Sequence, residues 1–214
     1  MMNARQIIAI LFIIASFILI GAPFWKYELL EANTEKYAAV QLSPEEIREN
    51  NEKPAEFEME AIEPPSVLDT VTKEAAVEKS AIVGQIEIPS VELSLPILKG
   101  TTNENLLAGA TTMRDDQWMG LGNYALAGHH MKRDTLLFSP ILRVEKGALI
   151  TVTDLTYTYT YEVTELDVVH ESRTDILDNT IEPVITLVTC YKSSEPEKRF
   201  IVHGVLKETK EYKK

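Results

Sequence analysis

The chain has 214 residues, a hydrophobic content of 45% and a formal net charge of −12 at pH 7. This hydrophobic content is enough for a packed core, so disorder over the whole length is excluded, and the length suits one domain with appendages. The sequence has no basic stripe with interleaved aromatic residues, which argues against nucleic-acid binding.

The first 26 residues predict a membrane anchor. Ile7–Trp25 is an apolar stretch of about 19 residues without a charge, close to the length that spans the hydrocarbon of a bilayer. Arg5 precedes it, and a Trp-Lys pair ends it at the expected interface position. A cleavable signal peptide is the alternative, but the run is longer than a usual signal core and residues 21–24 form a poor cleavage site. We therefore expect an uncleaved transmembrane helix (residues 1–26), with the N-terminus inside.

Residues 27–80 predict an acidic linker. They carry 14 acidic and 5 basic residues, which gives a net charge of −9. Prolines recur, and there are too few large apolar residues to bury a core, so we expect a solvated extracellular tether. Short helices are expected at Glu28–Val40, where the chain leaves the membrane, and at Val67–Val77, packed on the domain that follows.

The folded domain is expected at residues 81–207, with a charged tail at residues 208–214. Two short helical segments, Asn105–Ala110 and Leu136–Leu142, interrupt its strands. About eight strands joined by turns predict a mostly β fold, which is a closed antiparallel barrel or a sandwich. The strands with the clearest β-branched or alternating pattern are Ile82–Ile88, Val91–Leu98, Tyr124–Ala127, Ala148–Asp154, Tyr157–Val169, Val184–Cys190 and Lys198–Leu206.

Cys190, the only cysteine, ends one of these strands. A lone cysteine forms no internal disulfide, so it serves packing or reactivity. Because side chains alternate along a strand, Ile185, Leu187 and Thr189 share one face, while Val188 and Cys190 share the other. A thiol at a strand end, on the face away from the expected core, is a candidate nucleophile.

A cysteine nucleophile needs a base and an electrostatic partner, because a free thiol has a pKa of about 8.5 and is mostly protonated at neutral pH. His129 follows a short apolar strand and is the candidate general acid for a leaving amine. Arg199 begins the strand after Cys190 and shares a face with Ile201, opposite the core-facing Val202. Its planar fork of donors suits a developing oxyanion and also favours a thiolate.

The alternation also separates His129 from its neighbour. Tyr124 and Leu126 are expected to fill the core, so Ala127 and His129 belong to the opposite face, with the cysteine. His130 is expected to turn toward the connector that follows and to stay solvated.

Three short motifs carry a family resemblance. They are Thr186-Leu187-Val188-Thr189-Cys190, Ala127-Gly128-His129 and Arg199-Phe200-Ile201-Val202. In this order and at these separations, the chain resembles a class A sortase, a membrane-anchored cysteine transpeptidase of Gram-positive bacteria. The resemblance covers roughly residues 81–207. It implies a closed eight-stranded antiparallel sortase-type β-barrel with one or two short helices, and it assigns the catalytic roles to Cys190, His129 and Arg199.

The same resemblance implies a reaction. The substrate would be a surface protein with a C-terminal Leu-Pro-X-Thr-Gly sorting signal, cut between Thr and Gly through a thioacyl intermediate on Cys190. The acyl group would pass to an amine of the peptidoglycan precursor, lipid II, on the extracellular face of the plasma membrane. The groove for the extended peptide is expected to include Ala127, Val188, Thr189 and Ile201.

Other functions remain open from the sequence. A pilus-polymerising or otherwise specialised sortase would typically carry an N-terminal lid and a second C-terminal hydrophobic segment, whereas this chain ends in a charged tail. A plain cysteine endopeptidase would hydrolyse the intermediate and ignore added amines. A non-catalytic anchored binding module would tolerate loss of Cys190.

Neither a metal nor another cofactor is expected. The histidines do not converge at spacings typical of a metal site. Some class A sortases bind calcium through acidic residues in the loops before the histidine strand and before the cysteine strand. The spacing in this chain does not reproduce that pattern, so calcium activation is not expected. The acidic residues of these two regions are Asp115, Asp116, Glu171, Asp175 and Asp178.

Overall fold

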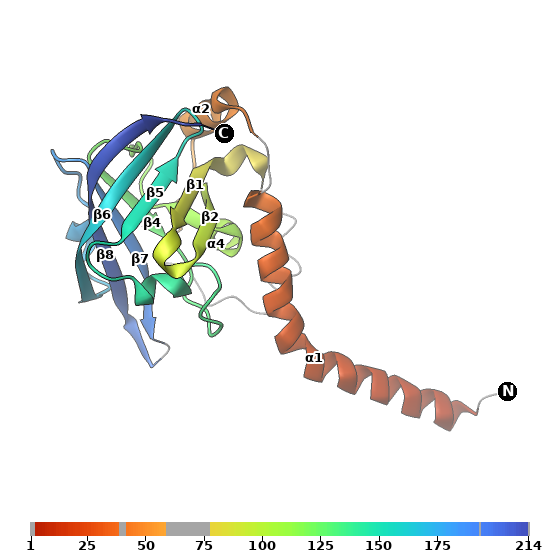
Figure 1. Cartoon of the computed structure of the whole chain (residues 1–214). Helices are drawn as coiled ribbons and strands as arrows, with labels where there is room; N and C mark the ends of the chain where they lie inside the picture. The colour runs from red at the N-terminus through yellow and green to blue at the C-terminus, as the bar shows by residue number, and fades with distance from the viewer. Residues whose placement is uncertain (1–2, 39–41, 59–77, 193, 214) are drawn as a thin grey trace.

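The computed structural model describes residues 3–38, 42–58, 78–192 and 194–213. Figure 1 shows a β-barrel with a long N-terminal helix. The later part of this helix runs beside the barrel, and the part nearer the N-terminus reaches away from it. The strands are β1 (Ile82–Ile88), β2 (Leu93–Leu98), β3 (Ala110–Thr112), β4 (Asn123–Ala127), β5 (Leu149–Thr153), β6 (Tyr157–His170), β7 (Val184–Lys192) and β8 (Glu195–Glu211). The helices are α1 (Ala4–Ala38), α2 (Pro44–Glu52) and α4 (Asn103–Ala108), with 3₁₀ turns η3 (Lys79–Ala81), η4 (Pro89–Val91), η5 (Ser139–Arg143) and η6 (Thr174–Leu177).

The predicted closed, eight-stranded barrel is confirmed, but the expectation that all its strands are antiparallel is wrong. The strands close in the order β1-β2-β3-β4-β7-β8-β6-β5. Two neighbouring pairs, β2 with β3 and β4 with β7, are parallel. Parallel neighbours need a crossover connection, which α4 supplies between β2 and β3. Alternation within a strand fixes its two faces but not the direction of its partner, so the sequence pattern left pairing direction undetermined.

The observed strands differ from the predicted ones in number and in their ends. β3 is not among the predicted strands, because three residues are too few for an alternating pattern. β7 continues past Cys190 to Lys192, and β8 begins at Glu195, before the predicted start at Lys198, so that Lys192 pairs with Glu195. β8 also continues to Glu211, which pairs with Tyr157 at the start of β6.

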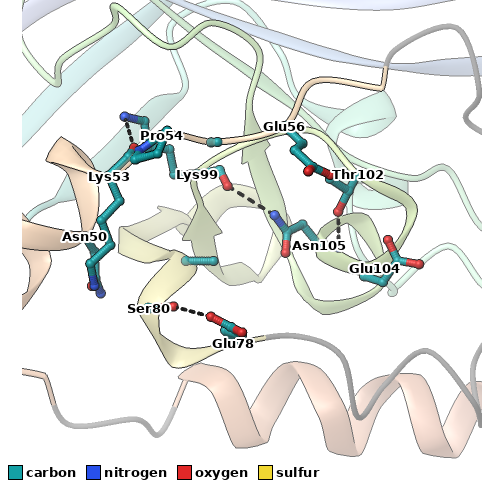
Figure 2. Close-up of a pocket in the computed structure, with 12 residues that line it drawn as sticks. Asn50, Lys53, Pro54, Glu56, Glu78, Ser80, Lys99, Thr102, Glu104 and Asn105 are labelled. Carbon is teal, nitrogen blue, oxygen red and sulfur yellow. Dashed lines mark hydrogen bonds between the residues drawn. The ribbon is translucent and has the colours of Figure 1, made fainter.

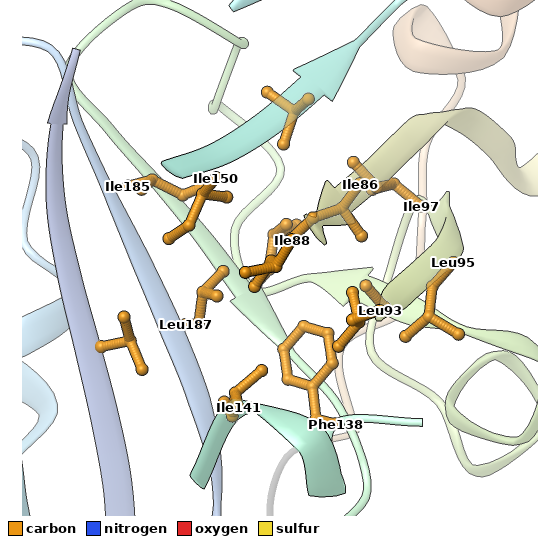
Figure 3. Packing of buried hydrophobic residues seen from close by; sticks show 14 of the residues in the cluster. Ile86, Ile88, Leu93, Leu95, Ile97, Phe138, Ile141, Ile150, Ile185 and Leu187 are labelled. Atoms are coloured by element: carbon orange, nitrogen blue, oxygen red, sulfur yellow. The ribbon is translucent and has the colours of Figure 1, made fainter. Parts of the chain in front are cut away.

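The barrel interior holds the main apolar core, part of which is drawn in Figure 3. Ile185 and Leu187 of β7 are completely buried in it, as are Leu126 of β4 and Val202 of β8. The faces predicted for these three strands are therefore confirmed. Because side chains alternate, the residues between these positions point to the outer face.

A smaller apolar cluster covers the outer face of β6, β7 and β8. Val169, Val188 and Ile201 are buried in it, and Met113, Ile176 and Leu177 pack against them. We refer to these six residues as the outer-face cluster. Ile176 and Leu177 belong to η6, in the connection from β6 to β7, so this connection lies on the outer face of the sheet.

Parts of the segment predicted to be a solvated tether pack on the barrel instead. Tyr37 of α1 is buried with Ile82 and Leu98, and Arg133 forms ion pairs with two glutamates of α1. Asn50 of α2 donates to the carbonyl oxygen of Ile82 at 2.9 Å. These few side chains hold α1 and α2 against the barrel, although residues 27–80 have too few large apolar residues to form a core of their own. The helix expected at Val67–Val77 lies outside the described residues.

α1 begins in the predicted anchor and continues past it to Ala38. Its apolar side chains from Ile7 to Phe17 that are described lie exposed. Among residues 3–38, 42–58, 78–192 and 194–213, no helix has both the length and the mean hydropathy that a membrane crossing requires. The anchor at residues 1–26 therefore stays a prediction.

Candidate active site

Two of the candidate catalytic residues pair directly on neighbouring strands, and the third follows the strand on the other side. β7 runs between β4 and β8, and its register pairs Ala127 with Val188 and Cys190 with Arg199. His129 comes two residues after Ala127, the last residue of β4, just as Cys190 comes two residues after Val188. We call His129, Cys190 and Arg199 the candidate row. It follows directly after the row Ala127, Val188, Ile201 on the same outer face.

Cys190 is exposed, whereas Val188 and Thr189 just before it are buried. The prediction that the thiol lies away from the core is confirmed. It stands at the rim of the sheet, open to a reacting group, and it contributes little to packing.

The backbone that carries His129 is held by two close contacts. Gly128 donates its amide to the carbonyl of Val188 at 3.1 Å, and the Thr189 hydroxyl donates to the carbonyl of Gly128 at 2.7 Å. A Cβ at position 128 would lie 2.4 Å from Cγ of Phe138, so only glycine fits under this ring. His129 itself is buried, with 6% of its surface exposed. These contacts explain why glycine precedes the histidine and why threonine precedes the cysteine.

His130 does not stay solvated as the sequence predicts. It is partly buried, and its Nδ1 lies 3.0 Å from the carbonyl oxygen of Cys190. Every second carbonyl of a strand points the same way, so the carbonyls of Val188 and Cys190 both face β4. The carbonyl of Val188 accepts a hydrogen bond from the backbone amide of Gly128. The main chain of β4 has ended at this level, so the imidazole of His130 takes the place of the next backbone donor. His130 thus contacts the backbone of Cys190 from the direction in which β4 lies next to β7.

Arg199 is held by three acceptors. Nη1 donates to the carbonyls of Pro196 at 2.6 Å and Lys198 at 3.2 Å, and Nη2 donates to Oε2 of Glu171 at 2.6 Å. A guanidinium has five N–H donors, so Nε–H and one Nη2–H have no partner among the described residues. These hydrogen bonds fix one edge of the Arg199 guanidinium, and its Nε–H and one Nη2–H can donate to a substrate oxygen.

Arg199→Lys is expected to lower turnover by about 10²–10³-fold, the scale of losing one oxyanion donor. Lysine keeps the positive charge but cannot satisfy three fixed acceptors and also donate from a planar fork. Steady-state kinetics on a sorting-signal peptide measures this loss.

Arg173→Lys is the matched control, because Arg173 forms an exposed ion pair with Asp175 in the neighbouring connection. It should leave turnover unchanged. Near-normal turnover of Arg199→Lys would mean that charge alone suffices, or that Arg199 has no role.

The predicted groove residues lie together, but they are covered. Ala127, Val188 and Ile201 form one row, with 8%, 7% and 0% of their surfaces exposed. Met113, Ile176 and Leu177 are partly buried and pack against the cluster that contains Val188 and Ile201. Thr189 is different, because its buried side chain points inward and holds Gly128.

Sequence reasoning missed Val169, which pairs with Arg199 and belongs to the outer-face cluster. The alternation of Tyr157, Tyr159, Tyr161 and Val163 in β6 would place Val169 on the core face. A register shift between Val163 and Glu165 reverses the faces beyond it. Sequence reasoning also missed Ile176 and Leu177 of η6. They are two apolar residues in a polar stretch, and this contrast is the only signal that the sequence gives.

The acidic residues weighed for calcium do not converge. Asp115 pairs with Lys99, Asp116 with Arg114, Asp175 with Arg173 and Glu171 with Arg199. The Arg114 guanidinium holds the pKa of Asp116 below its ordinary value, and Arg173 does the same for Asp175. Within the described part of the chain, no group of three metal-ligating side chains comes together.

A cavity of about 580 Å³ lies away from the candidate row (Figure 2), between α2, the segment after it and α4. Its polar groups are engaged with one another: Asn105 donates to the carbonyl of Lys99, and Ser80 donates to Glu78. The Lys99 ammonium donates to the carbonyls of Asn51 and Lys53. The cavity marks where the N-terminal segments fold over the barrel, and it holds no candidate site residue.

A closed barrel with an exposed cysteine that pairs with an arginine, next to a strand that leads into a histidine, is the arrangement expected of a barrel-type cysteine transpeptidase. Residues 86–207 match the family model of the sortase domain. Sortase A of Listeria monocytogenes serovar 1/2a is 43% identical over 210 residues, which cover 98% of this chain and 95% of that protein. Sortase A of Bacillus anthracis is 38% identical over 207 residues, covering 96% and 95%.

The solved structure of Listeria monocytogenes sortase A has a TM-score of 0.62 and 51% identity, covering 63% of this chain and 92% of that one. The chain therefore belongs to the sortase family, whose members are cysteine transpeptidases. The matches to sortases A over nearly the whole chain place it in class A.

Proposed function

We propose that this chain cleaves a Leu-Pro-X-Thr-Gly sorting signal between Thr and Gly and transfers the new acyl end to an amine of lipid II. The observation that carries the proposal is the pairing of the exposed Cys190 with Arg199 on neighbouring strands, with His129 two residues beyond Ala127, which pairs with Val188. Membership of the sortase family supports the reaction type. The matches to sortases A support cell-wall anchoring of surface proteins.

In the first half-reaction the thiolate of Cys190 attacks the carbonyl carbon of the threonine. The carbonyl π electrons move onto oxygen, and the donors of Arg199 stabilise this oxyanion. As the intermediate collapses, the C–N bond breaks and protonated His129 gives its proton to the leaving glycine amine. The products are a thioester on Cys190 and a free glycine amine.

In the second half-reaction an amine of lipid II attacks the thioester. His129, now neutral, accepts the proton that the amine loses. The C–S bond breaks, the thiolate of Cys190 is restored, and a new amide joins the surface protein to the precursor. The cycle needs no oxidant, reductant or metal step.

The location proposed for this reaction is the outer face of the plasma membrane. Ile7–Trp25 would span the bilayer once, with the N-terminus inside. The exposed apolar side chains from Ile7 to Phe17 support this proposal, because a contiguous apolar surface of this kind needs a partner other than water. The contacts of α1 and α2 with the barrel would then keep the catalytic domain near the membrane surface.

The test uses the full chain in detergent micelles, a quenched Leu-Pro-X-Thr-Gly peptide library and a panel of amines. We expect peptide cleavage, and we expect an added amine to appear in the product. Hydrolysis that ignores every amine would instead identify a cysteine endopeptidase. Isopeptide bonds to a protein lysine would identify a pilus-polymerising sortase, and binding without cleavage would identify a non-catalytic module.

A further inference from the structure

Glu171 lies where the end of β6 meets the start of β8. It is the first residue of the connection from β6 to β7, residues 171–183, which we call the η6 loop. β6 pairs Val169 with Arg199, and the backbone amide of Glu171 extends this pairing by donating to the carbonyl of Glu197 at 2.8 Å. A residue two positions beyond the directly opposed one is a diagonal neighbour on the same face. Glu171 is in this way the diagonal neighbour of Arg199, and its backbone is fixed to the same strand.

The carboxylate of Glu171 binds the Arg199 guanidinium across the two strands. Its Oε2 accepts from Nη2 of Arg199 at 2.6 Å. Glu195, which is nearer to Arg199 in the sequence, pairs with Lys192 and Lys198 instead. The partner of Arg199 is therefore set by the pairing of β6 with β8, and not by the turn between β7 and β8.

The three acceptors of Arg199 act on two different nitrogen atoms. The carbonyls of Pro196 and Lys198 both accept from Nη1, so by themselves they hold the guanidinium at one point. A planar group held at one nitrogen can still pivot about it. Glu171 holds Nη2, which is a second point, and so fixes the direction of the plane. The direction of Nε–H and of the other Nη2–H is fixed with it.

The charge of Glu171 also bears on its role. A carboxylate beside Arg199 weakens the positive potential that the guanidinium presents to a developing oxyanion. If Arg199 supplied only positive charge, this neighbour would lower its effect. A carboxylate at this place favours the reaction only if the direction of the donors matters more than the full charge, which is the condition for preorganised stabilisation of an oxyanion.

We propose that Glu171 is a positioning residue for acyl transfer, which turns the free donors of Arg199 toward the carbonyl that Cys190 attacks. Cys190 and Arg199 are directly opposed on β7 and β8, so donors with a fixed direction can meet the oxygen beside the thiol. Glu171 acts through Arg199 and not on the substrate. This inference rests on the proposed function, since it requires Arg199 to be the oxyanion donor.

The first test measures the kinetics of Glu171→Ala and Glu171→Gln, made in the full chain, on a sorting-signal peptide. We expect kcat of Glu171→Ala to fall on the order of tenfold, which is less than the loss of the donor itself because the contacts of Nη1 remain. KM should not change, because the oxyanion exists only in the transition state. Glu171→Gln keeps an oxygen that accepts from Nη2, so its kcat should return to within about threefold of the unaltered chain.

The second test combines Glu171→Ala with Arg199→Lys. Because Glu171 acts through the guanidinium, its loss should add less than about twofold to the loss caused by Arg199→Lys alone. A further tenfold loss in the double variant would show that Glu171 acts independently of Arg199, and it would overturn the proposal.

Asp175→Ala is the matched control. Asp175 is another carboxylate of the η6 loop, it is 56% exposed against 49% for Glu171, and it pairs with Arg173 instead of Arg199. It should leave kcat unchanged. All single variants should unfold at the temperature of the unaltered chain, because exposed ion pairs contribute little to stability. A loss of kcat in Glu171→Ala that follows a fall in unfolding temperature would indicate a structural role and would contradict the proposal.

A measurement without substrate separates this inference from the proposed function. The ¹⁵N relaxation of Nε–H of Arg199, assigned by its loss in Arg199→Lys, should report faster motion in Glu171→Ala than in the unaltered chain or in Asp175→Ala. If Arg199→Lys keeps normal turnover, the role of Arg199 in the proposed function fails. If Arg199→Lys loses turnover while Glu171→Ala changes neither kcat nor this motion, the positioning by Glu171 alone is overturned.

Discussion

Cys190→Ala is expected to abolish thioacyl formation and to leave the barrel folded. The thiolate is the only group in the candidate row that can form a thioester, and alanine offers no nucleophile. Mass spectrometry of the full chain, incubated with a thiol-reactive analogue of the sorting signal, measures the result. The unaltered chain should gain the mass of one adduct, and the variant should gain none.

Folding of this variant is a separate expectation with its own measurement. Cys190 is exposed on β7, so its loss should change the free energy of unfolding by less than about 0.5 kcal/mol, as for ordinary surface substitutions. Cys190→Ser is the matched variant, since it keeps the shape but replaces the thiol with a hydroxyl that stays protonated. An adduct on Cys190→Ala would end the assignment of the nucleophile.

His129→Ala is expected to lower kcat/KM by about 10²–10⁴-fold, the range of a lost general acid–base group. Without the imidazole the glycine amine must leave unprotonated, which makes it a poor leaving group. The contacts of Gly128 with Val188 and Thr189 hold the backbone that carries His129 against β7, close to the segment that carries Cys190. Kinetics with a sorting-signal peptide at neutral pH measures the change.

His130→Ala is the control for this experiment, because it removes the neighbouring imidazole. It loses one partly exposed hydrogen bond to the carbonyl of Cys190, so we expect a fall of less than about tenfold. Thermal unfolding of both variants checks that each remains folded. If His130→Ala is the inactive variant, the argument from strand faces and the assignment from the Ala-Gly-His motif are both wrong.

The role of Arg199 depends on how it is held. Glu171 neutralises one edge of the guanidinium, and two backbone carbonyls at the start of β8 fix its Nη1. An arginine held in this way needs little reorganisation when charge develops on the substrate oxygen, which is the condition for effective electrostatic stabilisation. The ion pair is partly exposed, so its contribution to folding stability is small.

The sequence by itself determined most of the strands and the two faces of β4, β7 and β8. Alternation along β4, β7 and β8 runs without a register shift from core residues such as Leu126, Leu187 and Val202 to the residues of the site. Each strand must bury one face, so the opposite face of each could be predicted locally. The alternation alone therefore assigns Cys190 and Arg199 to the faces of their strands that point away from the core.

Only the tertiary structure decided how these strands pair and what covers them. The parallel pairing of β4 with β7, the register shift in β6 that turns Val169 outward, and the contact of His130 with Cys190 leave no local pattern. The position of the η6 loop is fixed by donors from Arg114 and Asn123, which lie more than fifty residues earlier. Such hydrogen bonds depend on which segments meet in space, and a period-2 pattern carries no information about that.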